Sequence, residues 1–408
     1  MHSESDMQRI SRNVLFVAHD VALYGAQKSL LDIISKINRK VFDPHVVTPS
    51  IGPFTQELDK IGVKHISGLV QRWIYHPKSI SLYEVLRRPW RGLNHPYLLA
   101  ILSLVSLPFR IALLILYIRR HNVRLVYTNT ATMIDGAVAA RLCQIPHIWH
   151  LRERVAGNVD LASPFPVSWL PAFILRNSKF VITNSNMLAR ELFGNPLPGK
   201  VRVIHNGVDI EKFKPIYPQE VLNLPDGIKL TAVCGVIQEQ KDILTFVRAV
   251  ARLRDTHPKL HHLVIGRSNP VYQLKLEAEI ASLGLTNRIH FLGYRDDIPA
   301  LFSKIDILVS TSLYETFGRT LIEAMAAGKP VISVCSGGPE EIIENGKSGF
   351  LVDIGDDSAI AVKIAALLDN PDDFVEMSAA AMHRAETVFN LKNVVKRIET
   401  ILDESLVT

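Results

Sequence analysis

Short apolar runs alternate with helix-like segments along most of the chain, and this alternation restricts the fold more than any other feature. The first run, Asn13–Ala18, is followed by a turn at Tyr24-Gly25 and by an amphipathic segment from about Gln27. Strands that alternate with helices form parallel sheets covered by helices on both faces. The sequence therefore predicts an α/β protein.

The predicted strands form two series, separated by residues 206–226, where glycine and prolines interrupt a segment without periodicity. A length of 408 residues also favours two domains. We therefore predict an N-terminal domain over 1–210, a C-terminal domain over 211–390 and a final helix within 391–408 that could pack on either domain. The predicted strands are Asn13–Ala18, His45–Thr48, Leu125–Thr128, His147–His150, Phe180–Thr183 and Val201–Ile204 in the first series, and Leu230–Cys234, His262–Ile265, Ile289–Leu292, Ile307–Ser310 and Pro330–Val334 in the second.

The cysteine spacing and the first residues indicate a reducing compartment. Cys143, Cys234 and Cys335 lie far apart, without a CxxC pair or a neighbouring histidine cluster. This spacing argues against a disulfide framework or a zinc site and predicts buried thiols. The first ten residues contain no apolar segment of the kind found in secretory signals, so we expect a cytoplasmic protein.

The charges are distributed unevenly between the two halves. Residues 1–210 hold 25 Lys and Arg against 13 Asp and Glu, whereas the rest of the chain is acidic. A basic half is expected to face something anionic. The basic residues are not interleaved with aromatic residues, which argues against nucleic acid and leaves a membrane surface as the better partner.

Residues Tyr97–Ile118 form an aliphatic run that has three readings. The run is long enough to span a bilayer, but Arg110 near its centre would cost about 2.5–3.5 kcal/mol in hydrocarbon. Two ordinary core-facing helices are one alternative. An apolar surface that dips into the lipid interface is the favoured reading, and it places the protein on the cytoplasmic face of the inner membrane. The arginines that flank the run are Arg87, Arg88 and Arg91 before it, and Arg119, Arg120 and Arg124 after it.

The strongest functional signal follows the predicted strand Ile307–Ser310. A polar loop comes next, and a helix begins near Phe317-Gly318. A helix N-terminus at the carboxyl edge of a parallel sheet favours a bound phosphate. Glu315 precedes this helix and Glu323 lies inside it, and carboxylates suit sugar hydroxyls because they accept paired hydrogen bonds. Surface glutamates are usually only solvated, so it is their setting that makes these two candidates.

These residues resemble a motif of the retaining glycosyltransferases of family 4, also called glycosyl transferases group 1. The E-x7-E element of that family corresponds to Glu315 and Glu323, with Phe317-Gly318 between them. Similar segments run in order from about Asn13 to Val352, so the resemblance covers most of the chain. The other similar segments are Val203–Asp209, Gly235–Lys241, Glu323–Val331, Gly337–Ile343 and Asn345–Val352.

The resemblance implies a GT-B fold, in which two Rossmann-like domains with parallel sheets face each other across a cleft. The N-terminal domain would bind the acceptor and the C-terminal domain the nucleotide-sugar donor. Glu315 would contact the donor sugar and Glu323 the ribose. Backbone N–H groups around Phe317 and Gly318 would hold the diphosphate.

The resemblance also assigns roles outside this motif. Lys241, in the loop that begins at Gly235, would neutralise the leaving nucleoside diphosphate. Gly25 would let the backbone approach a phosphate or the acceptor, because glycine permits close contact and positive φ. His150 would line the cleft near the reacting carbon, and its position at the end of a parallel strand favours that role over a structural one.

The chain departs from the family at two places. Val236 stands where the family often has an arginine that contacts phosphate. Arg319, where the family often has an aliphatic residue, is our candidate for the replacement cation. Tyr24-Gly25 stands where a Gly-Gly pair is common, so the loop geometry and the acceptor stay open.

The predicted function is retaining transfer of a sugar from a nucleotide sugar to a lipid-linked glycan in cell-envelope polysaccharide or glycolipid synthesis. We expect no cofactor and no metal, because the sequence contains no Asp-x-Asp triplet. Two alternatives stay open. One is a nucleotide-sugar epimerase or a phosphorylase with the same fold, and the other is a non-catalytic, membrane-attached sugar-binding protein.

Overall fold

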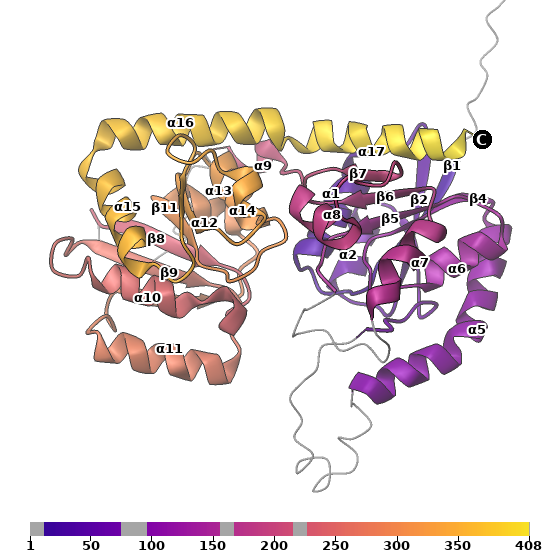
Figure 1. The fold of residues 1–408 in the computed structure, drawn as a ribbon, viewed down its shortest axis with the longest axis horizontal. Coiled ribbons are helices and arrows are strands. Elements are labelled where there is room, and N and C mark those ends of the chain that lie inside the picture. Colours follow the sequence, from indigo (N-terminus) through magenta and orange to yellow (C-terminus); the bar gives the residue numbers. More distant parts are fainter. Residues whose placement is uncertain (1–11, 75–95, 156–166, 215–226, 408) are drawn as a thin grey trace, which may run out of the picture. The chain divides into compact units, whose positions relative to one another are not determined.

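Two parallel sheets organise the chain into two units, which confirms the predicted pair of Rossmann-like domains (Figure 1). The computed structural model describes residues 12–74, 96–155, 167–214 and 227–407. Unit 1 comprises Met1–His205 and Val394–Thr408, and unit 2 comprises Asn206–Asn393. The chain therefore passes between the units twice. Residues 215–226 of the predicted boundary lie outside the described residues.

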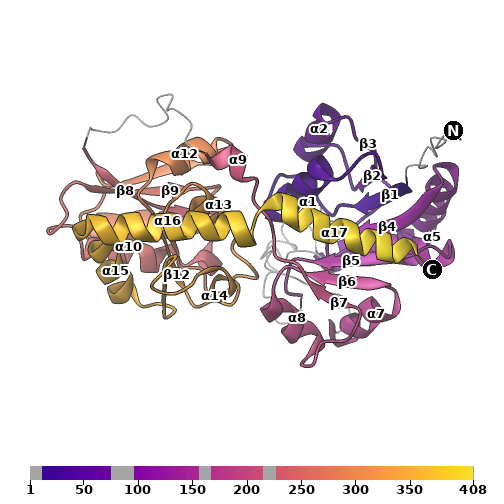
Figure 2. The same cartoon turned by 90° about the horizontal axis from the view of Figure 1, so that it is seen from above.

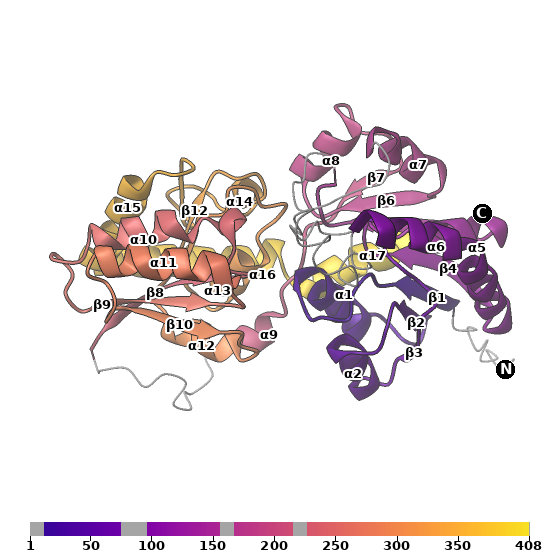
Figure 3. The same ribbon diagram turned by 90° about the horizontal axis from the view of Figure 1, so that it is seen from below.

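Unit 1 contains a seven-stranded sheet in the order β3-β2-β1-β4-β5-β6-β7. The order changes direction at β1, which lies between β2 and β4. Figures 1 and 2 show α17 along one face of this sheet, and Figure 3 shows α6 over the other. The strands are β1 (Arg12–Val17), β2 (Phe42–Thr48), β3 (Lys64–Ser67), β4 (Val123–Thr128), β5 (His147–Leu151), β6 (Phe180–Thr183) and β7 (Val201–Val203), and the α-helices are α1 (Gly25–Lys36), α2 (Pro53–Lys60), α5 (Pro96–Arg120), α6 (Asp135–Leu142), α7 (Leu170–Arg176), α8 (Asn186–Phe193) and α17 (Leu391–Leu406).

Unit 2 contains a six-stranded sheet in the order β10-β9-β8-β11-β12-β13. Here the order changes direction between β8 and β11, which are neighbours. The strands are β8 (Lys229–Cys234), β9 (Leu260–Ile265), β10 (Ile289–Gly293), β11 (Ile307–Ser310), β12 (Val331–Val334) and β13 (Phe350–Val352), and the helices are α9 (Ile210–Phe213), η2 (Glu239–Lys241), α10 (Ile243–Ala251), α11 (Pro270–Ser282), α12 (Ile298–Lys304), α13 (Arg319–Ala326), α14 (Pro339–Ile342), α15 (Asp357–Asp369) and α16 (Pro371–Val388).

All the predicted strands are present, whereas β3 and β13 were not predicted. Both are edge strands, and edge strands are commonly short and polar. In β3 every residue is at least partly exposed, and β13 has three residues. β3 therefore lacks the apolar run that signals a central strand, whereas β13 is apolar but too short for the pattern to mark it as a strand.

The C-terminal helix α17 packs on unit 1, which settles the alternative that the sequence leaves open. Lys179 Nζ donates to the carbonyl oxygen of Ser405 over 3.2 Å. The side chain of Glu399 accepts from the backbone N–H of Asn38 over 2.6 Å. Buried Ile398 and Leu402 give the helix an apolar side toward the unit.

Residues 96–120 form one helix, α5, so the reading of two separate core helices is wrong. Figure 1 shows α5 bending along its length, as expected for Pro108 inside a helix. Within the described part of the chain, Leu102–Arg120 is the one stretch that is long and apolar enough to cross a membrane. Arg87, Arg88 and Arg91 lie outside the described residues.

The prediction of buried thiols is wrong. Cys143 and Cys234 are half-buried and Cys335 is exposed, although all three are free cysteines. Cys335 directly follows β12 and Cys234 ends β8. Both positions lie at the carboxyl edge of the sheet, where strands give way to loops and side chains become accessible.

Candidate functional site

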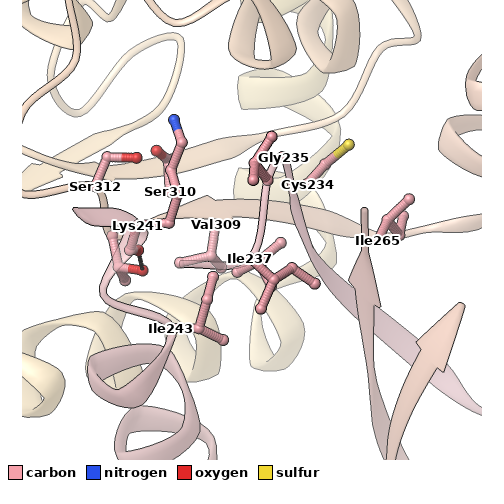
Figure 4. Close-up of a pocket in the computed structure, with 12 residues that line it drawn as sticks. Cys234, Gly235, Ile237, Lys241, Ile243, Ile265, Val309, Ser310 and Ser312 are labelled. Atoms are coloured by element: carbon pink, nitrogen blue, oxygen red, sulfur yellow. Dashed lines mark hydrogen bonds between the residues drawn. The ribbon is translucent and has the colours of Figure 1, made fainter. Parts of the chain in front are cut away.

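A pocket in unit 2 opens at the carboxyl ends of β8, β9 and β11. It lies where the strand order changes direction, which is the position at which open α/β sheets bind ligands. Figure 4 shows Lys241, Ser310 and Ser312 on one side of this pocket. The lining residues are Val233, Cys234, Gly235, Val236, Ile237, Lys241, Ile243, Ile265, Val309, Ser310, Thr311 and Ser312.

Two glycines allow β8 and β9 to end close together at this pocket. Gly235 has φ +149° and Gly266 has φ +144°. A Cβ atom added at Gly266 would lie 1.7 Å from the carbonyl oxygen of Gly235. A side chain at position 266 would therefore push the two strand ends apart and change the wall that carries Gly235.

Lys241 and Glu315 form an ion pair beside this pocket. The Nζ atom of Lys241 lies 2.6 Å from Oε2 of Glu315, and both side chains are about three-quarters buried (26% and 21% exposed). The backbone carbonyl of Lys241 accepts from Thr311 Oγ1 over 2.9 Å. The loop after β11 and the turn after β8 are thereby joined, and an anion and a cation lie next to each other at the sheet edge.

The backbone of the Glu315 loop is held by the segment after β12. The N–H of Glu315 donates to the carbonyl oxygen of Ser336 over 3.0 Å, and the N–H of Gly338 donates to the carbonyl oxygen of Glu315 over 2.7 Å. These bonds use the main chain of Glu315, so its carboxylate is left to face Lys241. A Cβ at Gly338 would come within 2.3 Å of Phe317 Cα, which shows how closely the segments approach.

Helix α13 begins next to this pair. Its N-cap, Gly318, has φ +107°, in the left-handed region that favours glycine. The side chain of Phe317 is buried in the core, where its ring lies 5.9 Å from that of Phe389. Phe317 therefore fixes the start of the helix, and its backbone lies at the positive end of the helix dipole.

Arg319, the first residue of α13, pairs with Glu323. The Nε atom of Arg319 lies 2.7 Å from Oε1 of Glu323, and Glu323 is 8% exposed. The four charged residues predicted at the donor site therefore form two ion pairs, Lys241 with Glu315 and Arg319 with Glu323. Gly235 lines the same pocket as Lys241.

His150 lies in unit 1, at the carboxyl end of β5, and it is 2% exposed. Its Nδ1 atom is hydrogen-bonded to the Tyr127 hydroxyl and lies 3.2 Å from Nη2 of Arg152. Arginine only donates, so Nδ1 must be the acceptor. Burial, with a smaller contribution from Arg152, lowers the pKa of His150 well below its usual value. His150 is therefore neutral and carries its hydrogen on Nε2.

The Nε2–H group of His150 is buried and has no hydrogen-bond partner among the residues that the structure describes. Burial also raises the pKa of Tyr127, so its hydroxyl keeps its proton. Arg152 is held in place by Asn129, whose Oδ1 accepts from its Nε over 2.8 Å. Asn129 in turn donates to the carbonyl oxygen of Ala26 in α1 over 3.1 Å. This network keeps the Nε2–H donor of His150 in one tautomer.

Gly25 is the first residue of α1 rather than a loop residue. A Cβ atom at Gly25 would meet nothing within 4 Å, and its φ is not positive. The expectation that Gly25 is needed for a positive φ is therefore wrong. Its proposed contact with a phosphate or the acceptor stays a prediction.

Several residues at the two sheet edges were not predicted. Ser310 and Ser312 line the unit 2 pocket, and Tyr127, Asn129 and Arg152 surround His150. Most of them could have been found from the sequence, because Ser310, Ser312, Asn129 and Arg152 are polar residues that end or closely follow a buried parallel strand. Tyr127 carries no such signal, since an aromatic residue inside an apolar strand usually indicates core.

Both halves of the chain match known glycosyltransferase families. The family model Glycosyltransferase Family 4 matches residues 24–212, and the model Glycosyl transferases group 1 matches residues 219–384. The UDP-Gal:alpha-D-GlcNAc-diphosphoundecaprenol alpha-1,3-galactosyltransferase of Escherichia coli is 25% identical over 396 residues, covering 93% of each chain. The D-inositol 3-phosphate glycosyltransferase of Streptomyces scabiei is 31% identical over 62% of this chain and 61% of its own length.

A solved structure extends the match to the whole fold. The structure of Anabaena Alr3699/HepE in complex with UDP and glucose has a TM-score of 0.76 and 22% identity, and the match covers 96% of this chain and 100% of the other. The predicted GT-B fold of two Rossmann-like domains is thereby confirmed. Since the two family models together account for both domains, the chain belongs to the group 1 glycosyltransferases.

Proposed function

We propose that this glycosyltransferase moves a sugar from a nucleotide sugar to a lipid-linked glycan acceptor, with retention of configuration, in cell-envelope polysaccharide or glycolipid synthesis. The observation that carries the proposal is the Lys241–Glu315 pair, 2.6 Å apart, next to the start of α13 at the carboxyl edge of the unit 2 sheet. A cation, a carboxylate and a helix N-terminus at this edge suit a diphosphate joined to a sugar.

Each part of this site suits one part of the donor. Glu323 would accept the ribose hydroxyls, and Glu315 would accept hydroxyls of the transferred sugar. Lys241 and the N-terminus of α13 would bind the diphosphate. UDP and glucose in the Anabaena structure support a nucleotide-sugar ligand for the fold.

The reaction would need no metal and no dedicated general base. The acceptor hydroxyl attacks the anomeric carbon on the face from which the diphosphate leaves. A new C–O bond forms, the C–O bond to the diphosphate breaks, and the hydroxyl proton passes to the departing phosphate. Lys241, Arg319 and the α13 N-terminus would stabilise the negative charge that develops on the diphosphate.

The acceptor class is supported by the relatives and by charge. The Escherichia coli relative is named for a diphosphoundecaprenol-linked substrate, and a lipopolysaccharide core biosynthesis mannosyltransferase of Rhizobium meliloti is 27% identical over 57% of this chain. The excess of basic residues in 1–210 suits an acceptor that carries phosphates at a membrane. We therefore place the enzyme on the cytoplasmic face of the membrane.

The first test is a thermal-shift panel of nucleotide sugars, because a donor that binds only the folded protein raises its melting temperature. The donor found in this way is then used with two variants. Glu323→Ala should abolish the shift, and Lys241→Ala should lower kcat by about a hundredfold or more, as expected when a group that stabilises a developing anion is removed. Lys275→Ala, at an exposed position of α11, is the matched control and should behave as wild type.

The same donor separates the alternatives. Without acceptor, an epimerase would rapidly convert the nucleotide sugar to an isomer, whereas a transferase would leave it unchanged or hydrolyse it slowly. A sugar-binding protein would show the thermal shift without turnover. An unchanged affinity of Glu323→Ala for the nucleotide sugar would contradict the assigned donor site.

A further inference from the structure

The outer face of α5 is apolar over about four helical turns. Leu102, Val105, Phe109 and Leu116 are 48%, 73%, 68% and 61% exposed. Together with exposed Ala112, they recur every three or four residues, so they share one face of the helix. A stripe of large apolar side chains in water is unfavourable, and such stripes mark interaction surfaces.

The opposite face of α5 packs into unit 1. Ile111, Leu114 and Ile118 are at most 5% exposed and belong to a core cluster with Val17 of β1 and Val126 of β4. Figures 1 and 3 show α5 beside α6 at the margin of unit 1. A helix that spans a bilayer would have to leave this core, so α5 can offer a membrane only its outer face.

Arg110, the charge at the centre of α5, is directed into the protein. Its Nε donates to Oδ1 of Asp135 over 2.7 Å, and its Nη1 donates to the carbonyl oxygen of Ser103 over 2.7 Å. Arg110 is 6% exposed and Asp135 is fully buried. The outer face between Leu102 and Leu116 therefore contains no charged residue, and Arg110 is no obstacle to contact with lipid.

The outer face ends in positive charge. Arg119 and Arg120 follow Leu116 by three and four residues, so they continue the same face, and both are exposed. Arg124, exposed on β4, follows shortly after. Residues 85–134 include no Asp or Glu. An apolar stripe that ends in arginines has the composition of an interfacial helix on anionic lipid.

We propose that the outer face of α5 docks on the surface of a bilayer that contains anionic lipids. The helix lies along the head-group boundary, with Leu102, Val105, Phe109 and Leu116 facing the acyl chains and with Arg119 and Arg120 at the lipid phosphates. The inference deepens the proposed function, on which it rests for a reason to approach a membrane, by naming the surface that would bring unit 1 to a lipid-linked acceptor.

Charge favours lipid over a second copy of this chain as the occupant. A second α5 could cover the apolar stripe, but residues 85–134, which include all of α5, contain no acidic side chain, so that helix itself offers Arg119 and Arg120 no partner. An anionic bilayer provides an apolar interior and phosphate groups together. It therefore satisfies both parts of the surface.

The test is cosedimentation of the full chain with vesicles of phosphatidylcholine alone and of phosphatidylcholine mixed equally with phosphatidylglycerol. The wild type should bind the anionic vesicles and lose affinity as salt is raised, because screening weakens its contacts with the head groups. Val105→Ser with Phe109→Ser should lower this affinity by about tenfold or more, since both side chains lose apolar burial. Arg119→Gln with Arg120→Gln should remove the preference for anionic vesicles.

A matched control uses the exposed apolar residues of α11. Val271 and Leu274 are 79% and 68% exposed, so Val271→Ser with Leu274→Ser removes similar surface from unit 2 and should leave vesicle binding unchanged. Thermal melts of every variant check that the chain is folded. Because all four α5 and α11 positions are exposed, we expect the melting temperatures to stay near that of wild type.

Three results would overturn the inference. These are a wild type that does not bind anionic vesicles, a Val105→Ser/Phe109→Ser variant that binds as well as wild type, and a dimer in light scattering that this variant dissociates while lipid binding is absent. The vesicle assay contains no nucleotide sugar, and the thermal-shift panel contains no lipid. Failure of the docking surface and failure of the proposed function are therefore distinguishable.

Discussion

The Nε atom of Arg319 lies 2.7 Å from Oε1 of Glu323, one turn further along α13. Arg319 is the first residue of the helix, where the helix dipole is positive and disfavours a cation. The carboxylate of Glu323 offsets this repulsion. One oxygen of the Glu323 carboxylate, which is proposed to bind ribose, is therefore paired with the Arg319 guanidinium. The family often has an aliphatic residue at the position of Arg319.

Replacing Arg319 with Leu should separate its effects on the two parts of a nucleotide. The nucleoside diphosphate of the donor found in the thermal-shift panel should bind about tenfold more weakly if Arg319 contacts the diphosphate, which is the size expected for a charge-assisted hydrogen bond. The corresponding nucleoside should bind equally well or better, because the Glu323 carboxylate is no longer shared with Arg319. Titration calorimetry with both ligands measures the difference. Arg248→Leu, which removes an exposed ion pair with Glu279, is the control, and an equal loss for both ligands would contradict a role at the diphosphate.

The sequence predicts the strands and the functional residues at their ends better than it predicts which of these residues contact each other. Glu315 and Lys241 were each assigned to the donor site, but their ion pair joins loops from different strands. That contact depends on β8 and β11 being neighbours in the sheet. Strand order is a tertiary property, and periodicity along one strand carries no information about it.

The failures have local causes. The cysteine spacing predicts a buried thiol at Cys335, but this residue follows β12 at the loop edge of the sheet and is exposed. The nature of Tyr97–Ile118 could not be predicted because Arg110 looks costly until its partner, Asp135, is known. Asp135 lies in the next helix, α6, and the hydropathy pattern does not show that its carboxylate meets Arg110.

His150 is predicted to act as a hydrogen-bond donor rather than as a base. His150→Phe removes its Nε2–H donor and should lower kcat/KM by about tenfold or more, whereas His150→Gln should retain part of the activity. Because burial and Arg152 lower the pKa of His150, the wild-type pH profile should show no imidazole ionisation near pH 6.5. A limb near pH 6.5 that disappears in His150→Gln would show that His150 works as a base. Tyr127→Phe, which leaves His150 in place, should have a smaller effect.

Acid should destabilise both units through buried histidines whose pKa is lowered, and His147 in unit 1 and His262 in unit 2 are two of them. Burial lowers the pKa of His147 in unit 1 and of His262 in unit 2 to about 3. The folded chain keeps both neutral, whereas the unfolded chain binds a proton below about pH 6.5. The stability is therefore fully present above that pH and is lost as the pH falls. The loss between pH 7 and pH 5 should be about 2 kcal/mol per histidine.

Urea unfolding at pH 5, 6 and 7 measures this loss. His147 has a fixed neutral tautomer, since it donates to the carbonyl oxygen of Asn177 over 3.0 Å and its Nε2 lies 2.8 Å from the hydroxyl of Thr128. His147→Gln is expected to be less stable at pH 7 but to show a flatter dependence on pH. An unchanged slope in this variant would mean that His147 is protonated in the folded chain.

Arg110 should stabilise unit 1 mainly by neutralising Asp135. Burial raises the pKa of Asp135 even though Arg110 opposes the shift, so the carboxylate depends on its partner. Arg110→Met leaves that carboxylate buried and unpaired, and it should cost about 3–5 kcal/mol in urea unfolding at pH 7. The loss should shrink at lower pH, because the raised pKa lets Asp135 bind a proton in the folded chain.

Asp135→Asn added to Arg110→Met should restore much of the stability, whereas Arg141→Met, at an exposed site on α6, should change little. A loss below about 1 kcal/mol for Arg110→Met would place this pair among weak surface contacts.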